Sequence, residues 1–246
     1  MRQTSVNVRL GRMSRPLRVA AGGIVYHVLN RANAGTRIFD GDADYAAFLR
    51  ITAEAVERVR MRLLAYCVMP NHWHLVLHPR ADSDLSRFMG WLTLTHTQRW
   101  HAHRHSIGAG HLYQGRFKSF PVQKEVYFLR LCRYVERNPL RARLVKRAED
   151  WQWSSLSARR QHATGPDWPE LSAWPVDPPP NWLQQVNRPQ TPAEEAAIQL
   201  SMTRSRPLGE PAWQKRTAAR LGLESTFRPR GRPRRPDDGE KKANPR

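Results

Sequence analysis

The chain has 246 residues, enough for one well-buried domain with appendages. It carries 41 Lys and Arg against 21 Asp and Glu, a formal charge of +20, and this excess favours a polyanionic partner, above all nucleic acid. No apolar run approaches the ~18 residues that cross a bilayer, and the Arg-rich start lacks the apolar stretch of a secretory signal. We therefore expect a cytoplasmic protein without a membrane partner.

The first regular elements follow a basic arm. Residues 1–20 show no hydrophobic period, whereas Ile24, Tyr26 and Val28 alternate with smaller or polar neighbours, as in a strand. Residues 42–60 carry apolar side chains at helical spacing, and the aspartates at their start suit a helix N-terminus. A strand and an amphipathic helix are therefore predicted.

The middle of the chain continues this mixed pattern. Residues 63–69 and 72–77 predict two strands joined by a bend, and residues 83–104 predict a helix. HLYQGRFKSFPV is typical of a strand or hairpin, and residues 124–137 form a strong helical pattern. This helix should end near Asn138, because a proline disfavours helical geometry in the residue before it. The fold class predicted is α+β, a mostly antiparallel sheet with helices packed on it.

The C-terminal third changes in composition. Its first part is rich in Trp and Pro, two helical segments follow, and the end is basic and of low complexity. We divide the chain into a basic arm (1–20), a core domain (21–160), a Pro/Trp-rich linker or wrap (161–195), a small basic helical segment (196–225) and a basic tail expected to be disordered alone (226–246).

A pair of histidines suggests chemistry. His72 and His74 alternate with one apolar residue in a predicted strand, so both imidazoles face the same side, as the ligands of a metal ion do. An H-x-H triplet alone is weak evidence. His101 and His103 form a second one, but helical spacing separates them by about 200°, and we interpret them as surface residues. Cys67 and Cys132 are expected to be buried and unpaired.

The helix over residues 124–137 carries the second part of the predicted site. Tyr127, Tyr134 and Asn138 share one flank of it, beside the buried face. Two imidazoles with an amide oxygen suit a divalent ion that keeps open positions for a phosphate, and a tyrosine hydroxyl can attack such a phosphate. A tyrosine in this position is more ordinarily a packed ring with a solvated hydroxyl.

Several motifs in a fixed order favour a catalytic role for this tyrosine over a packing role. AYCVMPNHWHLVLHP, HLYQGRFKSFPV and RLCRYVERNPLRARLV resemble the REP-associated branch of the single-tyrosine HUH transposases, of the insertion sequence 200/605 type. The resemblance implies a ferredoxin-like sheet, Mg or Mn held by His72 and His74, and Tyr134 as nucleophile. It places Asn138 at the third ligand position. Tyr127 remains the alternative nucleophile.

The resemblance also implies the substrate. Relatives cleave and rejoin hairpins of repetitive extragenic palindromes (REP) as single-stranded DNA, through a 5′-phosphotyrosine link, without a small-molecule substrate. A hairpin-binding module without turnover is the alternative, and a monomer and a homodimer both stay open. The tail motif RPRGRPRR resembles an AT-hook or a generic polybasic tail. The residues expected to bind DNA are basic: Arg31, Arg116, Lys118, Arg130, Arg133, Arg137, Arg141, Arg143, Arg228, Arg230, Arg232 and Arg234.

Overall fold

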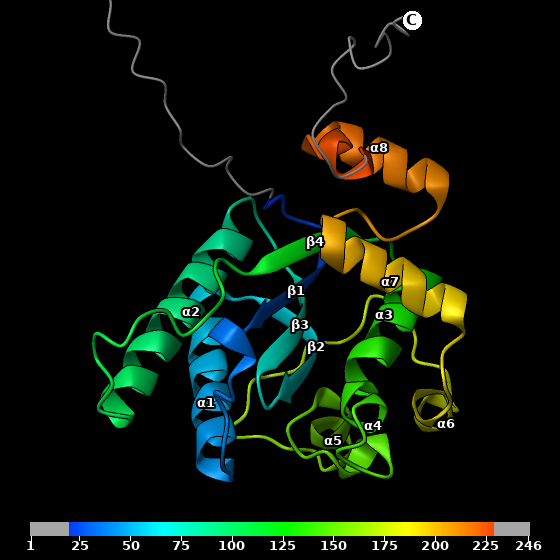
Figure 1. The fold of residues 1–246 in the computed structure, drawn as a ribbon. Helices are drawn as coiled ribbons and strands as arrows, with labels where there is room; N and C mark the ends of the chain where they lie inside the picture. Colours follow the sequence, from blue (N-terminus) through cyan, green and yellow to red (C-terminus); the bar gives the residue numbers. More distant parts are fainter. Residues whose placement is uncertain (1–19, 229–246) are drawn as a thin grey trace, which may run out of the picture.

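A four-stranded antiparallel sheet organises the molecule, for which the computed structural model describes residues 20–228. The strands lie in the order β2-β3-β1-β4 (Figure 1). Their bounds are β1 Val25–Arg31, β2 Arg62–Met69, β3 His72–His78 and β4 Lys118–Val122. With the two helices between them, the chain order is β-α-β-β-α-β, which is the ferredoxin-like arrangement. The predicted α+β fold class is confirmed.

Two long helices cover one face of the sheet. These are α1 (Asp42–Val59) and α2 (Asp84–His103), which lie side by side in Figure 1. The start of α1 is fixed by the carboxylate of Asp44, which accepts hydrogen bonds from the backbone N–H groups of Asp40 and Gly41. The space between these helices and the sheet is filled by large buried side chains, including Phe48, Phe88 and Trp73. This face is a closed hydrophobic core.

Helix α3 (Val126–Glu136) packs on the other face of the sheet (Figure 1). Its apolar residues Phe128, Leu131 and Val135 share a buried cluster with side chains of the strands. The predicted end of this helix near Asn138 is confirmed, since α3 stops at Glu136. After one residue the chain forms a further short helix, α4 (Asn138–Arg141). Its first turn contains Pro139, a position where a helix tolerates proline.

The C-terminal part is more regular than its composition predicted. It contains α5 (Ser155–Arg160), α6 (Trp182–Asn187), α7 (Pro192–Arg204) and α8 (Pro211–Leu221). Short 3-10 helices lie at Asn33–Gly35, Ala148–Asp150 and Glu224–Phe227. The two predicted helical segments are thus confirmed as α7 and α8. Trp174 donates to the Leu64 carbonyl and Trp182 to the carboxylate of Glu136, so tryptophans tie this region to β2 and α3.

The described part of the chain leaves out most of the predicted basic arm and tail. Residues 1–19 of the predicted arm and the tail residues Arg230, Arg232 and Arg234 lie outside the described residues. Within residues 20–228, the structure contains no helix that is both long enough and apolar enough to cross a bilayer.

Candidate functional site

Strand β3 serves both faces of the sheet. Trp73 points into the core under α1 and α2, and its neighbours His72 and His74 therefore point to the α3 face. In the register, His74 stands between Leu29 and Cys67, and His72 stands between Arg31 and Met69. The two imidazole rings are 5.0 Å apart between centroids. The structure thus brings the predicted histidine pair together on one surface.

A third histidine, which the sequence analysis missed, supports this pair. His27 of β1 is fully buried, and its Nε2 lies 2.9 Å from Nδ1 of His74. The rings of His27 and His74 stack at 5.0 Å, and Phe120 meets His27 edge-on at 4.9 Å. A signal was available in the sequence, because His27 alternates with the core residues Tyr26 and Val28 and so belongs to the opposite face.

The three imidazoles are held neutral by their surroundings. Burial lowers the pKa of His27 to about 3 and, with the charges of Arg31 and Arg141, lowers that of His72 to about 4. Burial and the neighbouring His72, His27 and Arg141 lower the pKa of His74 well below its ordinary value. Neutral imidazoles keep a lone pair on one ring nitrogen, which is the form that binds a metal ion.

Tyr134 of α3 lies over this histidine cluster. Its ring meets that of His74 edge-on, with 6.1 Å between centroids, and its side chain is only 2% exposed. The Tyr134 hydroxyl accepts a hydrogen bond of 2.9 Å from the Gln199 side chain of α7. Burial raises the pKa of Tyr134, while Arg141 and Gln199 act in the opposite direction. Gln199 was not expected from the sequence.

Arg141 connects the remaining predicted residues. Its guanidinium lies 4.4 Å from the centre of the Tyr134 ring and donates to Oδ1 of the buried Asn138 (3.3 Å). The Asn138 Nδ2 group is buried without a hydrogen-bond acceptor. The other candidate nucleophile, Tyr127, instead packs under Arg130, 5.3 Å from the ring centre. Tyr134 is therefore the tyrosine that lies beside the histidines.

The donor set fits a divalent ion in part. Asn71 Oδ1 lies 2.7 Å from His72 Nδ1, and because an amide oxygen only accepts, the proton sits on Nδ1 and the lone pair on Nε2. His74 has the same option if its Nδ1 donates to His27. Across residues 20–228, however, no cluster of three or more His, Cys, Asp or Glu side chains could hold a metal. Asn138, the predicted third ligand, is an amide, and its Oδ1 accepts from Arg141.

Three of the predicted DNA-binding cations lie at this site. Arg31 pairs with His72 in the register, Lys118 pairs with Leu29 in the row of His74, and Arg141 covers Tyr134. Paired residues of antiparallel strands point to the same face, so both strand cations are on the α3 side. Together they place positive charge around the histidines and the tyrosine.

The other predicted cations differ in their environments. Arg130 forms an ion pair with Glu194 (3.1 Å), and Arg133 donates to the carbonyls of Arg188 and Pro189, so both bind the chain itself. Arg137 is partly buried, and burial lowers its pKa. The exposed ones are Arg116, Arg143 and Arg228.

Comparison with known proteins finds one family model and a solved structure of similar fold. Residues 21–138 match the family model described as "Transposase IS200 like". A solved structure of a REP-associated tyrosine transposase bound to a REP hairpin has a TM-score of 0.50 and 18% sequence identity, and the match covers 66% of this chain and 96% of that chain. None of the curated proteins matches. The resemblance predicted from the motifs is confirmed by this match of residues 21–138 to the IS200-like transposase model.

Proposed function

We propose that the protein is a metal-dependent transposase that cleaves and rejoins single-stranded hairpin DNA, with Tyr134 as the nucleophile. The observation that carries the proposal is the contact between Tyr134 and His74, which joins a tyrosine to a pair of neutral imidazoles in a cationic setting. That the relative of known structure binds a REP hairpin supports a hairpin of this kind as the substrate.

The chain's own residues divide the work. His72 and His74 would hold Mg or Mn, with Asn138 as the third ligand, and His27 would keep the ring of His74 in place. A divalent ion bound there would polarise the scissile phosphodiester. Arg141 lies against Tyr134 and Asn138, where its charge can pair with a phosphate oxygen. Arg31 and Lys118 extend the positive surface along the sheet.

The proposed covalent step transfers the phosphoryl group from the 3′ oxygen of the DNA to the Tyr134 oxygen. The Tyr134 oxygen forms a bond to phosphorus, the bond from phosphorus to the 3′ oxygen breaks, the phenol loses its proton and the departing 3′ oxygen gains one. The product is a 5′-phosphotyrosine and a free 3′-hydroxyl, and the reverse reaction rejoins strands. Because burial raises the pKa of Tyr134, the donors that oppose this shift, Arg141 and Gln199, also favour the attacking phenolate.

A hairpin-binding module without turnover is the second candidate. It is favoured by the environment of Tyr134, because the residue is 2% exposed and its hydroxyl already accepts a hydrogen bond from Gln199. A phosphate that reaches this oxygen would have to displace the Gln199 side chain or its neighbours. Binding through the cationic face alone would need no such movement.

The deciding experiment is a denaturing gel of the full chain with labelled single-stranded hairpins from its own genomic neighbourhood. Mg, Mn and chelator are compared for the wild type, Tyr134→Phe and Tyr127→Phe. We expect a metal-dependent covalent adduct that is lost only in Tyr134→Phe. An adduct that is lost in Tyr127→Phe instead moves the nucleophile, and tight binding without any adduct supports the binding module.

A further inference from the structure

A second cationic surface lies on helix α8, at the far end of the sheet from the histidine pair (Figure 1). Leu208, three residues before this helix, is held against the end of β4, because its carbonyl accepts from the Gln123 N–H (2.8 Å). This end of β4 pairs with Val25 at the start of β1, whereas His72 pairs with Arg31 at the end of β1. The two surfaces are thus separated by about the length of that strand, roughly 20 Å.

Packing fixes the orientation of α8. Trp213 packs on Gly209, where an added Cβ would stand 2.5 Å from its ring. Thr217 and Ala218 are buried, and Leu221 packs against the hydrophobic core under α1 and α2. These positions share one side of the helix, and the opposite side faces solvent. The exposed positions recur at helical spacing and are Ala212, Lys215, Arg216, Ala219 and Arg220.

The cations of this exposed face are available to a ligand. Lys215, Arg216 and Arg220 form no ion pair or side-chain hydrogen bond with any residue from 20 to 228. Helix α8 itself contains no Asp or Glu. The neighbouring Arg206 is engaged within the chain, since its guanidinium donates to the Gln214 side chain (3.0 Å). The positive charge of α8 is therefore not balanced by the part of the protein that surrounds it.

This face suits double-stranded DNA in charge and in shape. A duplex carries about one negative charge per 1.7 Å of its axis, twice the density of a single strand, and α8 spans roughly 16 Å. The exposed side chains that alternate with the cations are the methyl groups of Ala212 and Ala219, so the helix can approach a major groove about 12 Å wide. The exposed acidic residues nearest in sequence, Glu210 and Glu224, lie beyond its two ends.

The same face lacks what a single-stranded site needs. Such sites stack bases on aromatic rings. None of the exposed side chains of α8 is aromatic, because Trp213 is half-buried. Phe227, which follows the helix, lies under the guanidinium of Arg206, 4.0 Å from the ring centre. The surface therefore favours phosphates of a duplex over unpaired bases.

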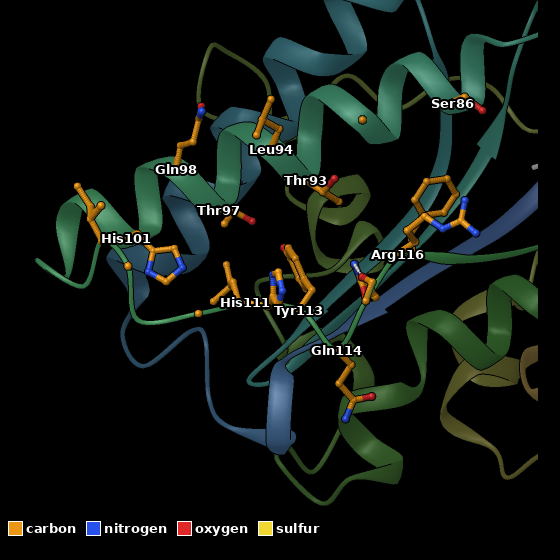
Figure 2. A pocket seen from close by; sticks show the side chains of 18 residues that line it. Ser86, Thr93, Leu94, Thr97, Gln98, His101, His111, Tyr113, Gln114 and Arg116 are labelled. Atoms are coloured by element: carbon orange, nitrogen blue, oxygen red, sulfur yellow. Dashed lines mark hydrogen bonds between the residues drawn. The ribbon is translucent and has the colours of Figure 1, made fainter. Parts of the chain in front are cut away.

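A hollow of about 1070 Å³ between α2 and residues 107–117 shows the opposite character (Figure 2). Its lining includes the aromatic ring of Tyr113, and Arg116 is the only Arg or Lys among its lining residues. His101, which the sequence analysis placed at the surface, is half-buried there. This hollow lacks the density of positive charge that the phosphates of a duplex require, so α8 is the better duplex surface.

We propose that the exposed face of α8 binds double-stranded DNA through its phosphates, as a contact separate from the candidate site. Lys215, Arg216 and Arg220 would neutralise phosphates whatever the base sequence, and the release of counterions would make this binding depend on salt. The contact goes beyond the proposed function, because it does not require Tyr134 to cleave DNA. It would hold the protein on duplex DNA beside the single strands on which the candidate site acts.

The test removes the three charges without disturbing the helix. Glutamine forms helices about as well as lysine and arginine do, so the α8 variant of the full chain combines K215Q, R216Q and R220Q. The matched control removes the same net charge from exposed positions of α1 and α2, and combines R50Q, R58Q and R87Q.

Binding is measured by fluorescence anisotropy in chelator, with a labelled linear duplex of unrelated sequence that forms no hairpin. Three phosphate contacts contribute about 2.7 to the slope of log K against log salt, so between about 50 and 200 mM salt the wild type should lose roughly 40-fold more affinity than the α8 variant. We expect the control to keep the wild-type slope. An unchanged slope in the α8 variant, or an equal fall in the control, would overturn the proposal.

Two further probes test the separation of the sites and the class of partner. A labelled short hairpin at 200 mM salt should bind the wild type and the α8 variant with affinities within about twofold of each other. A loss as large as that for the duplex would assign α8 to the hairpin site and overturn the proposal. A larger change of slope for a labelled single strand than for the duplex would also overturn it. Binding in chelator needs no covalent step, so absence of a Tyr134 adduct would refute the nuclease and leave this test intact.

Discussion

The two faces of the sheet use the same strands for opposite purposes. On the α1/α2 face, Trp73 and its neighbours of the same parity are buried among aromatic rings. On the α3 face, the alternate positions carry His72, His74 and His27, with Tyr134 above them. One face thus anchors the strand, and the other presents reactive groups. A strand that is anchored in a packed core holds its side chains more precisely than a loop does.

The sharpest contrast is between two tyrosines, one on each face. The Tyr113 hydroxyl is satisfied inside the core by Trp73 and His96, whereas the Tyr134 hydroxyl meets Gln199. Tyr134→Phe should abolish the covalent DNA adduct on denaturing gels and change stability little. Tyr113→Phe should instead lower the free energy of unfolding by ~1–3 kcal/mol, because it leaves buried polar partners unsatisfied, which urea denaturation measures. If Tyr134→Phe instead lost stability and still formed the adduct, Tyr134 would be a structural residue and not the nucleophile.

The next largest effect is expected at His27. Removing a residue that orients a metal-binding histidine typically costs 10–100-fold in affinity. His27→Phe should therefore weaken Mn binding by about that factor, as measured by calorimetry or by the signal of free Mn in electron paramagnetic resonance. His27→Gln, whose side-chain oxygen can still accept from His74 Nδ1, should restore part of it. Equal Mn affinity in the wild type and His27→Phe would remove His27 from the site.

A smaller effect concerns the buried histidine of the other face. Burial lowers the pKa of His96 from 6.5 to about 3, so over this range the unfolded chain binds the proton that the folded chain excludes. The contribution of neutral His96 to the free energy of unfolding is therefore fully present above pH 6.5 and is lost as the pH falls towards 3. Between pH 6.5 and 5 one such group accounts for about 1.5 kcal/mol. In His96→Gln, the free energy of unfolding measured by urea denaturation should change by that much less between pH 6.5 and 5. The same change as in the wild type would contradict this prediction.

The predictable parts of the molecule are those set by local pattern. Strand alternation placed His72 and His74 on one face, and helix spacing with Pro139 gave α3 and its end. The same alternation places His27 opposite Tyr26 and Val28, but its contact with His74 depends on the pairing of β1 with β3, which lie far apart in the sequence. The contacts of Arg133 with the carbonyls of Arg188 and Pro189, and of Gln199 with Tyr134, depend on how α7 and the segment before it return to α3. No periodicity within a segment contains that information.

Gln199 gives the smallest effect and tests whether that long-range contact matters to the site. Its amide N–H donates to the Tyr134 oxygen, which stabilises the phenolate and lowers the pKa of Tyr134. Gln199→Glu keeps the shape but puts a carboxylate where the donor was, beside Glu195, whose charge already acts to raise that pKa. The rate of adduct formation should fall by a factor of ~10, the equivalent of about 1.4 kcal/mol, and its pH profile should move to higher pH. Gln199→Ala should lose only a few-fold, because it removes a single hydrogen bond without adding charge. A merely structural role would lower the yield of folded protein in both variants and leave the pH profile where it is in the wild type.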